Sequence, residues 1–100
     1  MNLGIIQEIR ARVKRRYDPK ILVLFRVGDY YEAYFHDAYV IKSFLGLPLD
    51  YRSPDSGRYR PTVRIPVSSQ DEYLLRLHQS RLSIHIYQAM DPQGHFKILL

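Results

Sequence analysis

The sequence has no cysteine, few glycines and prolines, and no long hydrophobic run. Without cysteine the chain has neither a disulfide framework nor thiolate metal ligands. This absence fits a reducing compartment, so we expect a cytoplasmic protein. The longest apolar run, ILVLF at residues 21–25, is far shorter than the roughly 20 residues that cross a bilayer. The N-terminus also lacks an apolar segment of signal-peptide length, so we expect no contact with membranes.

The size and composition of the chain indicate one ordinary domain. Its 100 residues are 46% hydrophobic and 25% charged, which is typical of a soluble globular fold rather than of a disordered chain. A chain of this length can bury roughly 60 to 70% of its unfolded surface in a single core. We therefore expect a single domain over residues 1–100 that folds by itself.

The charge balance favours an anionic partner. The formal net charge is +5 and the sequence pI is about 9.6, so the surface potential is positive and attracts polyanions from a distance. Nucleic acid is one candidate for such a partner. The alternative is a domain that is basic without a dedicated polyanion site.

The N-terminal segment predicts an amphipathic helix. Ile6, Ile9, Val13 and Tyr17 follow one another at spacings of three, four and four residues, which places them on one helical stripe. Asp18-Pro19 then ends the helix. The other side carries five cations within seven residues, which form either a solvated face or a grip on phosphates: Arg10, Arg12, Lys14, Arg15 and Arg16.

The remaining patterns predict an α/β (α+β) fold, with a mixed β-sheet flanked by about three helices. ILVLF is apolar without alternation, which favours a central strand covered on both faces. Ser69 and Glu72 have the spacing of a capping box at the start of a third helix. The other expected elements are an extended segment at 30–35, a helix at 36–46, short strands at 47–51 and 62–66 around a polar loop, and a hairpin of strands within 82–87 and 95–100.

Familiar catalytic patterns are missing. The sequence has no G-x-x-x-x-G-K-[ST] phosphate loop and no G-x-S-x-G elbow, and its four histidines lack zinc-site spacing. We therefore expect no enzymatic activity, no cofactor and no metal. One alternative stays open, because Asp29, Glu32 and Asp37 lie near one another in the chain and carboxylates can converge on Mg²⁺ in nucleases. The simpler interpretation places Asp29 in a turn and Asp37 at a helix cap.

One long stretch carries a family resemblance. ILVLFRVGDYYEAYFHDA, residues 21–38, resembles the opening of the N-terminal mismatch-recognition domain of the MutS family of DNA mismatch-repair proteins. GLPLDYR, Ile65-Pro66, DEYLLRL and LSIHIYQ follow in the same order, so the similarity runs from about residue 17 to 88. The resemblance implies the mixed sheet and flanking helices of that family's first domain.

The resemblance also implies a site. In the family, a Phe-x-Glu motif enters the minor groove at a mispaired or unpaired base, where the ring stacks on the base and the carboxylate hydrogen-bonds it. The matching residues here are Tyr30 and Glu32, with tyrosine in place of phenylalanine, supported by a turn at Gly28 and Asp29. The implied partner is double-stranded DNA with a mismatch or distortion, bound without the ATPase and clamp domains of a full MutS.

The rings around this motif are expected to differ in exposure. We expect Tyr30 in solvent, whereas Phe25, Tyr31, Tyr34 and Phe35 pack in the core or on the sheet. If the domain binds DNA, the candidate phosphate contacts are Arg26, Arg52, Arg58 and Arg60. Two alternatives remain, a protein-interaction module that keeps the fold without mismatch specificity, and general nucleic-acid binding that includes RNA.

Overall fold

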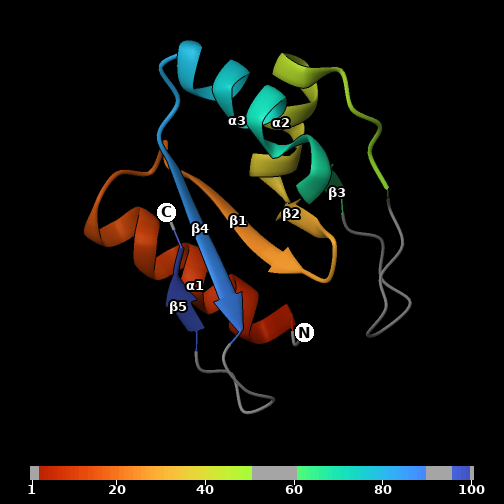
Figure 1. The fold of residues 1–100 in the computed structure, drawn as a ribbon. Coiled ribbons are helices and arrows are strands. Elements are labelled where there is room, and N and C mark those ends of the chain that lie inside the picture. Colours follow the sequence, from red (N-terminus) through yellow and green to blue (C-terminus); the bar gives the residue numbers. More distant parts are fainter. Residues whose placement is uncertain (1–2, 51–60, 90–95, 100) are drawn as a thin grey trace.

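A computed structural model describes residues 3–50, 61–89 and 96–99, and these residues form a mixed five-stranded sheet with helices on both faces (Figure 1). The fold class expected from the sequence is confirmed. In chain order the elements are α1 (Leu3–Arg16), β1 (Leu22–Val27), β2 (Tyr30–Tyr34), α2 (His36–Leu45), β3 (Thr62–Pro66), the 3₁₀ turn η1 (Val67–Ser69), α3 (Gln70–Gln79), β4 (Ile84–Ala89) and β5 (Phe96–Ile98).

The sheet is built around β1. Its strand order is β3-β2-β1-β4-β5, with β1 parallel to β4 and every other neighbouring pair antiparallel. Leu22 to Phe25 are buried on both faces of the sheet, which explains why this strand lacks polar alternation. The β4–β5 pairing confirms the expected C-terminal hairpin, while its DPQG turn lies outside the described residues.

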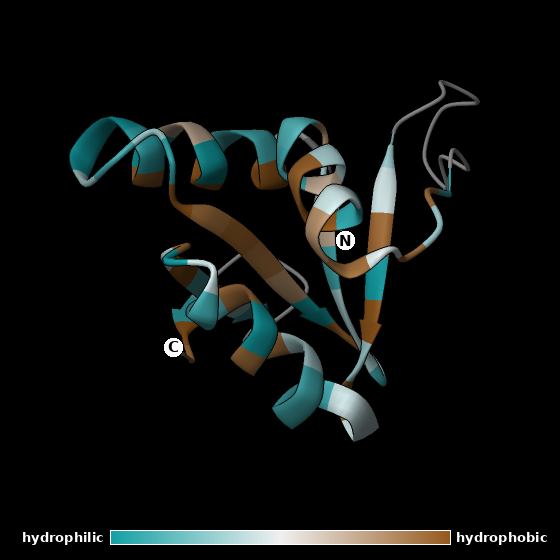
Figure 2. Ribbon diagram, turned by 90° about the horizontal axis from the view of Figure 1, so that it is seen from above, coloured by the Kyte–Doolittle hydropathy of each residue, from teal (hydrophilic) through white to brown (hydrophobic). Residues whose placement is uncertain are grey.

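Helices cover the two faces of the sheet with separate hydrophobic clusters. Leu22, Leu24 and Tyr31 face α2 and α3, whereas Val23 and Phe25 face α1. The division follows the alternation of side chains along a strand. Figure 2 shows the sheet lying between α1 on one side and the two later helices on the other.

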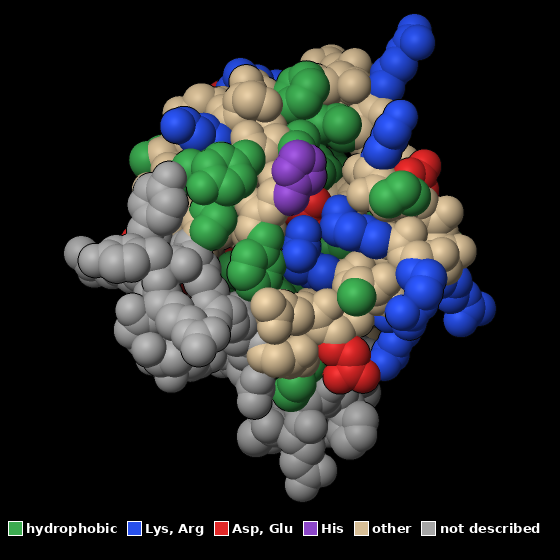
Figure 3. Space-filling view, turned by 180° about the vertical axis from the view of Figure 1, so that it is seen from behind, with side chains coloured by type: hydrophobic (Ala, Val, Ile, Leu, Met, Phe, Trp, Pro, Cys, Tyr) green, Lys and Arg blue, Asp and Glu red, His purple; other side chains and the backbone are tan. Residues whose placement is uncertain are grey.

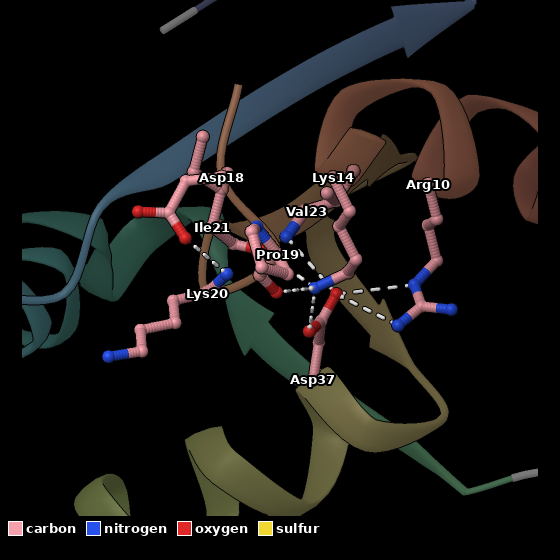
Figure 4. A network of polar contacts seen from close by, with 8 residues as sticks. All are labelled: Arg10, Lys14, Asp18, Pro19, Lys20, Ile21, Val23 and Asp37. Atoms are coloured by element: carbon pink, nitrogen blue, oxygen red, sulfur yellow. Dashed lines mark hydrogen bonds and ion pairs between the residues drawn. The ribbon is translucent and has the colours of Figure 1, made fainter. Parts of the chain in front are cut away.

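A buried carboxylate joins α1 to the rest of the fold (Figure 4). Asp37 is only 1% exposed, and its Oδ2 accepts hydrogen bonds from Arg10 Nη2 at 3.1 Å and from the Val23 amide at 3.3 Å. Its Oδ1 lies 2.7 Å from Lys14 Nζ. The helix-cap interpretation of Asp37 is therefore wrong, since Phe35 occupies the N-cap position of α2 and this carboxylate binds two cations of α1 instead.

Two local expectations fail. Residues 47–50 form no strand; Asp50 instead makes an isolated bridge with Thr62, with both backbone hydrogen bonds at 2.8 Å. Pro48 lacks an amide donor, which disfavours regular pairing here. The capping box is also absent, because Ser69 makes no side-chain cap bond. The chain enters α3 through η1, whose geometry lets the Gln70 amide bond to the Val67 carbonyl.

The Asp37 network predicts a large effect on stability. Replacing Asp37 by asparagine leaves the part-buried cations of Arg10 and Lys14 without their anion, so we expect the free energy of unfolding to fall by about 3 kcal/mol. The matched control is Glu8→Gln, which removes the exposed pair between Glu8 and Arg12 at 3.2 Å and should change stability by about 0.5 kcal/mol or less. Urea denaturation measures both, and equal losses would contradict a structural role for the network.

Candidate functional site

The β1–β2 hairpin has a fixed two-residue turn. Val27 pairs with Tyr30, so Gly28 and Asp29 form the loop, and Gly28 has φ +58°, a conformation that glycine adopts without steric cost. The Arg26 side chain folds back and donates from Nε to the Gly28 carbonyl at 2.7 Å. The Val67 amide donates to the Asp29 carbonyl at 2.9 Å. The corner is thus held by contacts from both β1 and η1.

The ring next to this turn is the exposed one. Tyr30 is 41% exposed, whereas Tyr31 is 6% exposed and Tyr34 and Phe25 are also buried. The Tyr31 hydroxyl donates to Gln70 Oε1 of α3 at 2.7 Å, which fixes that ring in the core. The expected division between one exposed ring and packed neighbours is confirmed.

Tyr30 and Glu32 lie on the same face of β2, because they are two residues apart on a strand. Glu32 is buried and has partners on both of its oxygens. Oε1 lies 3.2 Å from Arg64 Nε, and Oε2 accepts a hydrogen bond from the Tyr34 hydroxyl. The site therefore presents an exposed ring beside a carboxylate that already has a cationic neighbour.

Arg64 is the residue of this site that sequence reasoning did not identify. It lies directly opposite Glu32 in the β2–β3 register, and its guanidinium carbon is 5.7 Å from the centroid of the Tyr30 ring. The alternation of TVRIP places Arg64 on the strand face opposite to the buried Val63 and Ile65. Its pairing with Glu32 depends on strand register, which the sequence pattern did not provide.

Of the four candidate phosphate contacts, the structure describes only Arg26. Arg26 is engaged with the turn and also lies 5.7 Å from the Tyr31 ring centroid, while Arg52, Arg58 and Arg60 lie outside the described residues. On α1, Arg10 and Lys14 bind Asp37. Exposed cations remain at the end of that helix, and Figure 3 shows Lys and Arg side chains spread over the rear face of the molecule. The exposed cations near that end are Arg15, Arg16 and Lys20.

The three carboxylates considered for a metal serve separate purposes. Asp29 is exposed in the turn, Glu32 binds Arg64, and Asp37 is buried against α1. Within the described ranges, no group of three or more His, Cys, Asp or Glu side chains is arranged to hold a metal ion.

In the same part of the chain, no helix has the length and hydrophobicity that crossing a membrane requires.

One phenol near the α1 face has a shifted pKa. Burial raises the pKa of Tyr87 above its ordinary value of 10.0, and the neighbouring Tyr17 raises it further, against a smaller lowering by Arg12. The Tyr87 ring lies 6.2 Å from that of Phe25, between centroids. Tyr87 therefore stays neutral at ordinary pH and serves as a packing residue of β4.

The mixed five-stranded sheet with three helices agrees with one class of domain, the first domain of MutS proteins. The family model described as MutS domain I matches residues 10–98. Proteins named DNA mismatch repair protein MutS are similar over most of the chain. The one from Fusobacterium nucleatum subsp. nucleatum is 35% identical over 84 residues, covering 83% of this chain and 9% of the relative.

Two further MutS relatives are also similar over most or all of the chain. The protein from Chlorobium phaeobacteroides is 38% identical over 81 residues, which cover 80% of this chain and 9% of the relative. The one from Thermotoga petrophila is 31% identical over all 100 residues and 12% of its own length. This chain belongs to the MutS domain I family. It spans about a tenth of the length of the curated relatives that it matches.

The positive φ of Gly28 predicts how the hairpin responds to substitution. An added Cβ meets no heavy atom within 4 Å, so any penalty comes from the backbone conformation alone. We expect Gly28→Ala to lower the free energy of unfolding by about 1–2 kcal/mol. Gly28→Asn should lower the free energy of unfolding by less, because asparagine tolerates a positive φ better than alanine does. Chemical denaturation of the three proteins checks the order, and an alanine variant as stable as the wild type would contradict it.

Proposed function

We propose that this domain recognises mismatched or distorted double-stranded DNA, with Tyr30 as the wedge and Glu32 as its polar companion. The observation that carries the proposal is the exposed Tyr30 ring, held at the end of a braced hairpin with Glu32 on the same strand face. Membership of the MutS domain I family supports it. The names of the relatives point to mismatch repair as the process.

The physical basis is a comparison of deformation energies. Opening a base step to admit a side chain costs a few kcal/mol, and the cost is lowest where pairing is already faulty. An aromatic ring that enters the step regains about 1–3 kcal/mol of stacking. Insertion of the same ring therefore has a more favourable net free energy at a mismatch than in a perfect duplex. Selectivity arises from this difference rather than from reading a sequence.

The tyrosine hydroxyl adds a requirement that a phenylalanine lacks. A hydroxyl buried between bases without a partner costs about 1–3 kcal/mol, which is comparable to the stacking gain. The proposal therefore places the hydroxyl of Tyr30 where it meets a base edge, a sugar or water. This requirement makes the lesion preference of a tyrosine wedge different from that of a phenylalanine wedge.

The proposed role is binding without catalysis. DNA phosphates would be held by cations. The candidates are Arg26 beside the hairpin turn, Arg15 and Arg16 of α1, and, from the sequence, Arg52, Arg58 and Arg60. Such contacts position the protein on the duplex but carry no sequence information. We propose further that the domain works in mismatch repair or a related process, with double-stranded DNA as its partner.

Binding to matched and defective duplexes tests the proposal. Fluorescence anisotropy would compare a perfect duplex with one that carries an unpaired thymine, at two salt concentrations. We expect tighter binding to the defective duplex and a loss of about 5- to 150-fold in affinity for it in Tyr30→Ala, the equivalent of the stacking free energy. Tyr30→Phe keeps the ring and should still bind the defective duplex more tightly than the perfect one. The same is expected of Tyr39→Ala, which removes an exposed tyrosine of α2.

Other outcomes separate the alternatives. Equal binding to both duplexes that weakens steeply with salt would indicate general affinity for polyanions. An absence of binding to either duplex would favour a protein-interaction module. A preference that survives Tyr30→Ala would show that another part of the domain recognises the defect.

A further inference from the structure

Arg64 joins the two residues of the proposed wedge from the neighbouring strand. Its Nε lies 3.2 Å from Glu32 Oε1, and its guanidinium lies 5.7 Å from the centre of the Tyr30 ring. The β2–β3 register sets this arrangement, because Arg64 is the cross-strand neighbour of Glu32. A single cation thus contacts both the ring and the carboxylate.

The two partners of Glu32 hold its carboxylate in one orientation. Arg64 engages Oε1 and the Tyr34 hydroxyl engages Oε2, so rotation of the group would break one contact or the other. A carboxylate offers about four lone-pair positions, and these two contacts leave acceptor capacity for a further donor. The Arg64 side chain is 51% exposed, whereas that of Glu32 is 11% exposed, so the cation is the more accessible of the two charges.

A carboxylate at a DNA interface has an electrostatic cost. Duplex DNA carries one negative charge per about 1.7 Å of its axis, so an isolated Glu32 would be repelled by the phosphates on either side of the groove. An adjacent cation cancels this repulsion at short range while the carboxylate keeps its acceptors. Arg64 is placed to do so, and it also lies within cation–π range of the ring that enters the DNA.

We infer that Arg64 is a third residue of this site, a positioning residue that neutralises Glu32 and aligns it with Tyr30 for contact with a base. The inference rests on the proposed function. It assigns Arg64 to the carboxylate rather than to a phosphate. The two roles differ in one measurable respect, because a neutralising cation matters only while Glu32 is charged, whereas a phosphate contact matters whatever residue stands at position 32.

A double-mutant cycle measures this difference. The variants are Arg64→Gln, Glu32→Gln and the double variant, each titrated against the perfect duplex and the duplex with an unpaired thymine. We expect Arg64→Gln to weaken binding to both duplexes by about tenfold in the wild-type background, through repulsion by the uncompensated carboxylate. In the Glu32→Gln background the same substitution should change affinity by less than about twofold, since no charge remains to neutralise.

Two further variants keep the cycle interpretable. Arg64→Lys retains the charge and should recover most of the overall affinity, although its ammonium lacks the planar guanidinium that pairs with a carboxylate. Arg64→Thr is a second neutral variant, polar and compatible with a strand, used in the same cycle if the glutamine variant unfolds. Circular dichroism and thermal unfolding of each protein establish that the fold is retained before binding is compared.

The possible failures are distinguishable. If the wild type prefers the defective duplex but Arg64→Gln costs the same in both backgrounds, and lowers the salt slope by about one, Arg64 is a phosphate contact. That result overturns the inference and leaves the proposed function standing. A wild type without any preference for the defective duplex overturns the proposed function, and the inference with it.

Discussion

Burial of β1 on both faces is the constraint on which the rest of the structure depends. A strand that exposes neither face needs a helical layer on each side, and α1 supplies one layer while α2 and α3 supply the other. Asp37 links these layers, because its carboxylate lies at the start of α2 and binds Arg10 and Lys14 of α1 together with the Val23 amide of β1. The hairpin that carries the site thus begins on the most firmly enclosed strand of the fold.

The candidate site takes its rigidity from this strand. The turn at Gly28 leads directly from β1, and one backbone hydrogen bond, from the Val67 amide of η1, reaches the Asp29 carbonyl behind it. Tyr30 is therefore exposed but attached to a braced corner, so its backbone is already ordered in the free domain. Glu32 and Arg64 lie next to it on paired strands rather than on loops, and sites on regular elements are held in place more firmly than sites on loops.

Much of this arrangement follows from local patterns in the sequence. The apolar run at β1, the stripe of α1 and the Gly-Asp turn each depend on near neighbours, and the exposed position of Tyr30 followed from that turn. The roles of Asp37 and Arg64 could not be predicted from local patterns. Their partners lie in other elements and meet them only through helix packing or strand register. The failed strand at 47–50 and the failed cap at Ser69 show the same limit, since backbone contacts from Thr62 and η1 replaced the local preference. The cytoplasmic location stays a prediction.

The position of β3 at the end of the sheet gives Arg64 a second consequence. An outermost strand carries backbone groups that a foreign chain can pair with, and natural proteins discourage such pairing with charged side chains. Arg64 projects from the middle of β3, and the bridge between Asp50 and Thr62 occupies one end of the same strand. Replacing this arginine with an apolar residue would remove a charge from the edge strand and favour pairing with a second copy. The cation beside the proposed wedge is thus also of the kind that discourages self-association.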